Sequence, residues 1–219
     1  QWLNDLFTKV VGERTDVALI AVGGYGRRDL SPLSDLDILL LHKNANDIDT
    51  VAEGLWYPIW DHGEKLGHSV RTLDETLDLA SSDLDTATSL LSCRHIGGSK
   101  ELADELSSLA LSQWKNKARN WLPKLATSIQ QRHRAKGEVA FMLEPELKEG
   151  RGGLRDVHAM GWANLSGQGP LEVEHHQLLE CYEVILRARV ELHRKSNRAS
   201  NKLLLEQIGR WLNLRPSEF

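Results

Sequence analysis

The sequence predicts an α+β fold, in which a small mixed β-sheet with flanking helices is followed by an all-α helical domain. Short apolar runs typical of buried strands lie early in the chain, and helical periodicity dominates from about Ser82 onward. The chain has 219 residues, of which 41% are hydrophobic, so it can build two modules with their own cores. We place an α/β module at 1–95 and a helical module at 96–219.

The first module is predicted from three short strands and one crossing helix. Val17–Val22 is rich in β-branched residues and stops at a glycine turn, and Asp37–His42 is too short and too apolar for an amphipathic helix. Between 47 and 61 the apolar residues recur at helical spacing, which predicts a helix across the sheet with Pro58 as a kink near its end. Gly67–Arg71 is the third predicted strand.

The rest of the chain is predicted to be helical. Thr72 and Glu75 have the spacing of a capping box, which starts a helix after the third strand. Helical periodicity then continues to about Leu192, and we expect no further strand. The breaks between helices are predicted at three turn-rich segments, 96–99, 149–153 and 166–170.

Composition excludes several classes of protein. The 27 Lys and Arg residues against 31 Asp and Glu give a net charge of −4, which argues against a nucleic-acid-binding protein. No apolar run approaches the roughly 18 residues of a membrane helix, and no secretory signal is visible. Cys93 and Cys181 lack disulfide or metal spacing, so we expect reduced thiols packed in the core of a cytoplasmic protein.

The segment between the first two strands carries the predicted chemistry. Gly23 and Gly24 lack side chains, so their backbone amides can approach a triphosphate closely. Asp35 and Asp37 follow at the opening of a strand, where alternation points both carboxylates to one face. Such a pair repels unless a cation lies between its members, and Mg²⁺ accepts ligands from carboxylates, phosphates and water. The run has neither a Walker A nor a dinucleotide-binding signature.

Two glycines followed about ten residues later by Asp-x-Asp resemble the nucleotidyltransferase superfamily typified by DNA polymerase β. Within that superfamily, three segments are similar to the bacterial PII uridylyltransferases: GGYGRRDLSPLSDLDILLL (23–41), LGHSVRTLDE (66–75) and EPELKEGRGGLRDVHAMGWAN (144–164). The resemblance covers nearly the whole chain. It implies that 1–95 is the nucleotidyltransferase core and 96–219 the helical domain of that family.

The resemblance implies an enzyme that moves UMP from UTP to a tyrosine hydroxyl of PII, the nitrogen-signalling protein, and releases pyrophosphate. In the implied two-metal mechanism, one Mg²⁺ lowers the pKa of the attacking hydroxyl and the other neutralises the leaving group. The implied metal ligands and catalytic residues are Asp35 and Asp37, and the implied nucleotide contacts are Gly23, Gly24, Arg27 and Ser34.

Several alternatives stay open on the sequence alone. The transferred group is alternatively AMP from ATP, because the glycines and aspartates address phosphates and metals that UTP and ATP share. The acceptor is alternatively the hydroxyl of an antibiotic or metabolite. The chain is alternatively a fragment that binds nucleotide or PII without turnover, since the third carboxylate usual in the superfamily is not assigned. Lys65 stands where relatives often carry that acid, with Asp61, Glu64 and His68 as neighbours.

Two features of the helical module have alternative interpretations. The glycines before the helix that starts near Leu154, with Lys148, Arg151 and Arg155, form either a phosphate-binding helix N-terminus or an ordinary cap with solvated charges. A basic cluster on the last long helix is predicted to be a solvated face, with docking of PII as the alternative. Its members are Arg187, Arg189, His193, Arg194, Lys195 and Arg198.

The ends of the chain predict a piece of a longer protein. Gln1 is not an initiator methionine, and the sequence stops soon after a strong helical pattern. Relatives carry a His-Asp phosphohydrolase domain and ligand-sensing domains that we do not find in these residues. We therefore expect a one-way transferase fragment that does not respond to glutamine.

Overall fold

The structure is a computed structural model that describes residues 1–168 and 175–207. Its contacts divide the chain into two compact units. The first unit joins 1–30 to 34–121, and the second joins 31–33 to 122–219.

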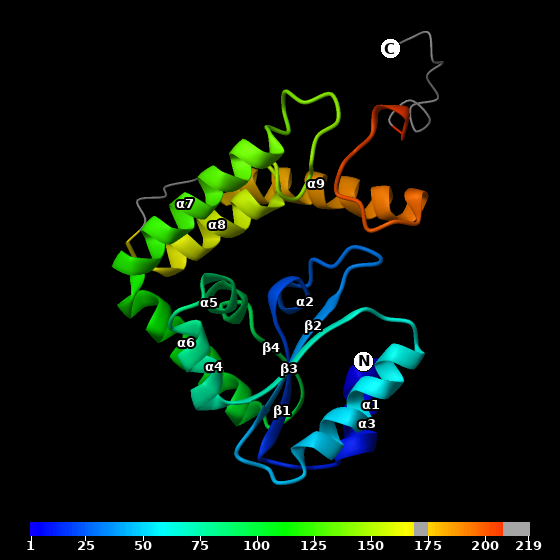
Figure 1. The fold of residues 1–219 in the computed structure, drawn as a ribbon, viewed down its shortest axis with the longest axis vertical. Helices are drawn as coiled ribbons and strands as arrows, with labels where there is room; N and C mark the ends of the chain where they lie inside the picture. The colour runs from blue at the N-terminus through cyan, green and yellow to red at the C-terminus, as the bar shows by residue number, and fades with distance from the viewer. Residues whose placement is uncertain (169–174, 208–219) are drawn as a thin grey trace. The chain divides into compact units, whose positions relative to one another are not determined.

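The first unit is built on a four-stranded sheet of order β3-β2-β1-β4. Its strands are labelled in Figure 1. β1 pairs antiparallel with both β2 and β4, whereas β2 and β3 are parallel, so the sheet is mixed as predicted. The three predicted strands are confirmed within a residue or two at each end. The strands are β1 (Val17–Ala21), β2 (Leu36–His42), β3 (Leu66–Thr72) and β4 (Arg94–Gly98).

The helix predicted between the second and third strands is α3, and it makes the parallel pairing of β2 with β3 possible because parallel neighbours need a crossover. The predicted capping box is also confirmed: Glu75 N donates to Thr72 Oγ1 at 3.3 Å, and Thr72 N donates to Glu75 Oε2 at 2.8 Å. The helices of this unit are α1 (Trp2–Val11), α2 (Gly23–Arg27), α3 (Ile48–Asp61), α4 (Leu73–Ala80), α5 (Leu84–Leu90) and α6 (Lys100–Asn116).

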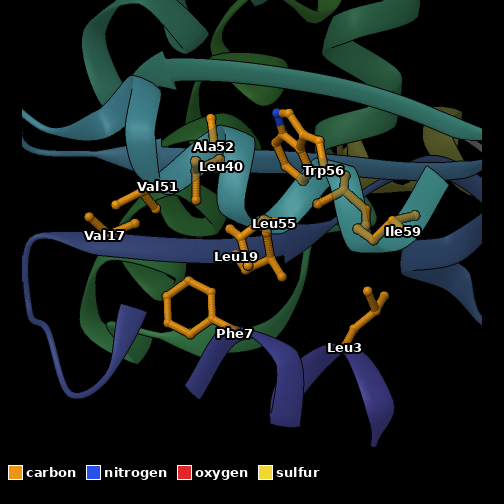
Figure 2. Close-up of a cluster of buried hydrophobic side chains, with 11 residues drawn as sticks. Leu3, Phe7, Val17, Leu19, Leu40, Val51, Ala52, Leu55, Trp56 and Ile59 are labelled. Atoms are coloured by element: carbon orange, nitrogen blue, oxygen red, sulfur yellow. The ribbon is translucent and has the colours of Figure 1, made fainter. Parts of the chain in front are cut away.

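The core of the first unit lies where α1 and α3 pack on the sheet (Figure 2). Leu19 of β1, Leu40 of β2 and Leu55 of α3 are fully buried there, together with Phe7 of α1. Burying such side chains stabilises the fold by about 1.5–3 kcal/mol each. The residues that alternate with Leu40 along β2 face the other side of the sheet.

The fourth strand corrects the sequence analysis, which placed a break at 96–99 and expected no strand after the third. Arg94–Gly98 pairs with β1, with an irregular register between Leu19 and Ile20. The segment has no apolar alternation, so periodicity could not identify it. Its glycines have a packing reason: a Cβ on Gly98 would lie 2.7 Å from the Phe7 ring.

The contact boundary between the units falls at 121/122, whereas the sequence places the boundary between modules at 95/96. The difference arises from α6, which contacts β1 and β4 and buries Leu102 and Leu106. The following residues continue this packing, because the Trp114 and Trp121 rings stack with their centroids 5.9 Å apart.

In its described residues the second unit combines helices with turns and loops, and two isolated β-bridges pair 138 with 151 and 146 with 202. Its first helix begins in the last residues of the first unit. The break predicted at 149–153 is confirmed, and residues 169 and 170 of the break at 166–170 lie outside the described residues. The helices are α7 (Ala118–Lys136), α8 (Leu154–Leu165) and α9 (His175–Ser196).

Across residues 1–168 and 175–207, no helix is both long and apolar enough to cross a membrane.

The two cysteines have different surroundings. Cys93 is partly buried, and burial raises the pKa of its thiol to about 12 although a hydrogen bond with Ser107 opposes the shift. Cys181 is exposed on α9, so the prediction that both cysteines pack in the core is wrong for Cys181.

We expect one fast-reacting thiol in the folded chain. At about pH 8, close to the ordinary pKa of a thiol, an alkylating reagent should modify Cys181 and spare Cys93, because the thiolate is the nucleophile. Mass spectrometry of peptides from the alkylated native protein measures both sites. Cys181→Ser should remove the fast reaction, and rapid modification of Cys93 in the native protein would contradict the expectation.

Candidate functional site

The glycine pair opens the short helix α2 directly after β1. Gly23 has φ +54°, a conformation that side-chain-bearing residues rarely adopt. The start of the turn is tied to the neighbouring strand, because Val22 N donates to the Asp37 carbonyl at 3.0 Å. Gly26 packs so closely that a Cβ there would lie 1.9 Å from the Ser92 carbonyl oxygen. The backbone therefore requires glycine at two positions of this motif.

The Asp37 carboxylate lies between two glycines. Asp37 is in register with Gly67 of the parallel strand β3. A Cβ on Gly67 would lie 2.6 Å from Asp37 Oδ1, and a Cβ on Gly23 would lie 3.2 Å from Asp37 Oδ2. The missing side chains thus leave room for this carboxylate in its orientation. Gly67 is a site residue that the sequence analysis did not select, because only strand pairing brings it to Asp37.

Asp35 lies immediately before β2, exposed, and Asp37 is half-buried as the second residue of that strand. Ile38 belongs to the core under α1 and α3, so alternation places Asp37 on the opposite face of the sheet. Two carboxylates one residue apart, beside glycine backbone, suit a hard cation such as Mg²⁺. Among the described residues, no three His, Cys, Asp or Glu side chains are arranged to hold a metal.

Arg27 lies beside the second glycine of the pair. Its Nε donates to Asp29 Oδ2 at 2.9 Å, and Asp29 is only 9% exposed. Asp29 N donates to the Gly24 carbonyl at 3.1 Å, and a Cβ on Gly24 would lie 3.2 Å from Asp29 Oδ1. The Arg27–Asp29 pair therefore folds the chain back over Gly24. Ser34, half-buried, directly precedes Asp35.

The position considered for a third carboxylate is occupied by Lys65, whose side chain cannot supply one. The Lys65 carbonyl accepts from Leu36 N at 2.8 Å, so Lys65 itself lies next to the start of β2. Asp61 and Glu64 are exposed, and Glu64 Oε1 lies 3.6 Å from His62 Nδ1.

His68 has a packing role. Its ring contacts those of Trp56 and Trp60 on α3, with centroids 5.3 Å and 5.6 Å apart. It is paired with Ile38, and alternation along β3 places it on the opposite face from Gly67. The geometry therefore supports the structural interpretation of His68 over a catalytic one.

The N-terminus of α8 does not offer free amides to a phosphate at the positions expected. Leu154 N donates to the carbonyl of residue 147 at 3.0 Å, and Arg155 N donates to that of residue 148 at 2.9 Å. Arg155 Nε also lies 3.3 Å from Glu149 Oε1. This segment is therefore a turn that caps its own helix, which favours the structural interpretation of the motif.

Asp156 is the centre of a polar network in the second unit. It accepts from Arg132 Nη2 at 2.5 Å, from Gly152 N at 2.7 Å, and lies 2.9 Å from His133 Nε2. Burial alone would raise the pKa of this carboxyl, but the hydrogen bonds with His133 and Arg132 outweigh it and hold the pKa below its usual range. Next to the network lies a cavity of about 520 Å³ along α7 and α8, with a mainly apolar lining that includes Leu122 and Ile129.

The basic cluster on α9 corrects the sequence analysis in part. Arg187 and Arg194 are exposed and pair with glutamates of their own helix, as a solvated face predicts. Arg189 and His193 are 9% and 1% exposed, so the prediction is wrong for these two. Helical periodicity identified the charged positions but not the chain segment that covers them.

Comparisons with known proteins relate the chain to a family of uridylyltransferases. Residues 122–214 match the family described as GlnD PII-uridylyltransferase. The chain is 40% identical over 94% of its length to a bifunctional uridylyltransferase/uridylyl-removing enzyme of Streptomyces coelicolor, and 41% identical over 94% to one of Mycobacterium tuberculosis. A protein of the same description from Aliivibrio fischeri is 36% identical over 86% of the chain. The chain spans about a quarter of the length of these relatives, 25%, 26% and 23% respectively.

Gly67→Ala should disturb the Asp37 carboxylate without unfolding the protein. The added Cβ meets only the end of a side chain that can rotate, so we expect the free energy of unfolding to change by less than about 1 kcal/mol. Affinity for Mn²⁺, a paramagnetic probe for Mg²⁺, should fall roughly tenfold because the ligand is turned away. Electron paramagnetic resonance measures the free ion. Gly161→Ala, where a Cβ meets nothing within 4 Å, is the control, and equal Mn²⁺ affinity in both variants would count against the site.

The Asp156 network should make the second unit sensitive to acid. Because the pKa of Asp156 is lowered in the folded state, its contribution to stability is present above the ordinary pKa of 3.8 and is lost as the pH falls through the folded value. Asp156→Asn should therefore lower stability at neutral pH by roughly 1–3 kcal/mol and flatten its decline in acid. Urea unfolding followed by circular dichroism between about pH 7 and pH 2 measures this. A variant whose stability curve parallels that of the wild type would contradict the assignment.

Proposed function

Because this chain belongs to the family of bifunctional uridylyltransferase/uridylyl-removing enzymes, we propose that it carries out uridylyl transfer, moving UMP from UTP to a tyrosine hydroxyl of the PII signalling protein with release of pyrophosphate. The observation that carries the proposal is the Asp37 carboxylate held between Gly23 and Gly67, with Asp35 two residues before it. The family description supports PII as the acceptor. Two unpaired thiols fit a reducing cytoplasm, where nitrogen metabolism would be regulated.

The residues of the site have different roles in the proposed transfer. Asp35 and Asp37 are the carboxylates that would hold Mg²⁺, and Gly23 and Gly24 let phosphate oxygens approach the backbone. Arg27, fixed by Asp29, adds positive charge beside the glycine pair. When bound, Mg²⁺ supplies charge that favours the ionised hydroxyl and the leaving pyrophosphate. The protein's own contribution is to align the hydroxyl with the α-phosphorus opposite the leaving oxygen.

Transfer should depend on the two aspartates. The test is to incubate the chain with PII, Mg²⁺ and either UTP or ATP, and to measure the mass of intact PII by mass spectrometry. The same measurement decides between UMP and AMP as the transferred group. We expect a mass increment of one nucleotide, and Asp35→Ala or Asp37→Ala should slow its appearance roughly 100-fold or more, because metal-bound charge is lost.

Asp49→Ala is the matched control, since Asp49 is an exposed carboxylate on α3 of the same unit and should leave the rate unchanged. A folded wild-type chain that adds no nucleotide to PII, or an increment that survives both aspartate substitutions, would refute the proposal.

A further inference from the structure

The segment between the glycine pair and the aspartates is held by α9. Arg189 Nη1 donates to Ser31 Oγ at 2.9 Å, and Arg189 Nε donates to Asn201 Oδ1 at 2.6 Å. His193 Nδ1 bonds the Pro32 carbonyl. A carbonyl oxygen only accepts, so Nδ1 carries the proton in this contact. By its contacts, the segment 31–33 belongs to the second unit although strands of the first unit flank it in the chain.

The residues that form this contact are buried. Ser31, Arg189 and His193 are 4%, 9% and 1% exposed. A buried guanidinium is costly unless its donors are bonded, and hydrogen bonds to a charged group are about twice as strong as neutral ones. Removing one partner would leave a buried polar group unsatisfied. The contact therefore fixes the segment in one arrangement.

The backbone of the segment needs such a contact. Leu33 has φ +64°, a left-handed conformation that costs a leucine free energy and persists only where neighbouring contacts impose it. The two hydrogen bonds from α9 fall on the two residues directly before Leu33. Asp35 follows Leu33 after a single residue. The direction in which the chain enters β2, and with it the placement of Asp35, depends on this turn.

We propose that Arg189 and His193 are positioning residues, which act through the segment 31–33 to orient Asp35 for metal-bound nucleotide. The role assigned to Asp35 rests on the proposed function. The fixing of segment 31–33 by the hydrogen bonds from α9, which we call the hold, does not. The same helix supplies an internal comparison: Arg194 is 64% exposed in its side chain, pairs with Glu191 and does not take part.

The first experiment measures the hold itself by hydrogen–deuterium exchange of the whole chain. Arg189→Met and His193→Leu should accelerate exchange in peptides covering 31–37 roughly tenfold or more, while α9 keeps its protection. His193→Asn keeps a donor near the position of Nδ1 and should restore slow exchange. Arg194→Met is the control and should exchange as the wild type does. Unchanged exchange in 31–37, or equal acceleration throughout α9, would overturn the hold.

The second experiment measures the consequence for the site by titrating Mg²⁺ and UTP into the same variants in the absence of PII. Arg189→Met and His193→Leu should weaken nucleotide affinity roughly tenfold, and His193→Asn should recover it. Variants with accelerated exchange but wild-type affinity would overturn the positioning role. A wild-type chain that binds no nucleotide would instead refute the proposed function, with the exchange result still deciding the hold.

Discussion

The room that two glycines leave for one carboxylate is the constraint on which the candidate site depends. Asp37 keeps its orientation because neither Gly23 nor Gly67 has a side chain. Gly67 reaches this position through the parallel pairing of β3 with β2, and that pairing requires the crossover helix α3. The buried face of α3 on the sheet (Figure 2) thus supports a polar site on the opposite face.

Sequence reasoning succeeded where local pattern and local structure coincide. The apolar runs of β1 and β2 and the capping box of Thr72 depend on residues near one another in the chain. Local sequence pattern was therefore sufficient to predict these elements. Local sequence pattern did not identify features that depend on residues distant in the chain. β4 owes its conformation to pairing with β1, and Gly67 owes its place in the site to register rather than to any motif of its own.

The basic residues of α9 show the same limit in another form. Arg187 and Arg194 follow the expectation that charge on a long helix is solvated. Arg189 and His193 are instead buried, and they form hydrogen bonds with a segment about 160 positions earlier. That segment joins the glycine pair to the aspartates. By its contacts the segment belongs to the second unit, most of which matches the family described as GlnD PII-uridylyltransferase.

The most direct test of the central claim is calorimetric binding of UTP to the wild-type chain and to Asp37→Asn, each with Mg²⁺ and again with a chelator. Mg²⁺ should strengthen the binding of UTP to the wild type. The amide in Asp37→Asn has the shape of the carboxylate without its charge, so it should abolish that gain while the fold is retained. Equal binding with Mg²⁺ and with chelator, or a gain that survives in Asp37→Asn, would show that Asp37 does not hold the metal that binds the nucleotide.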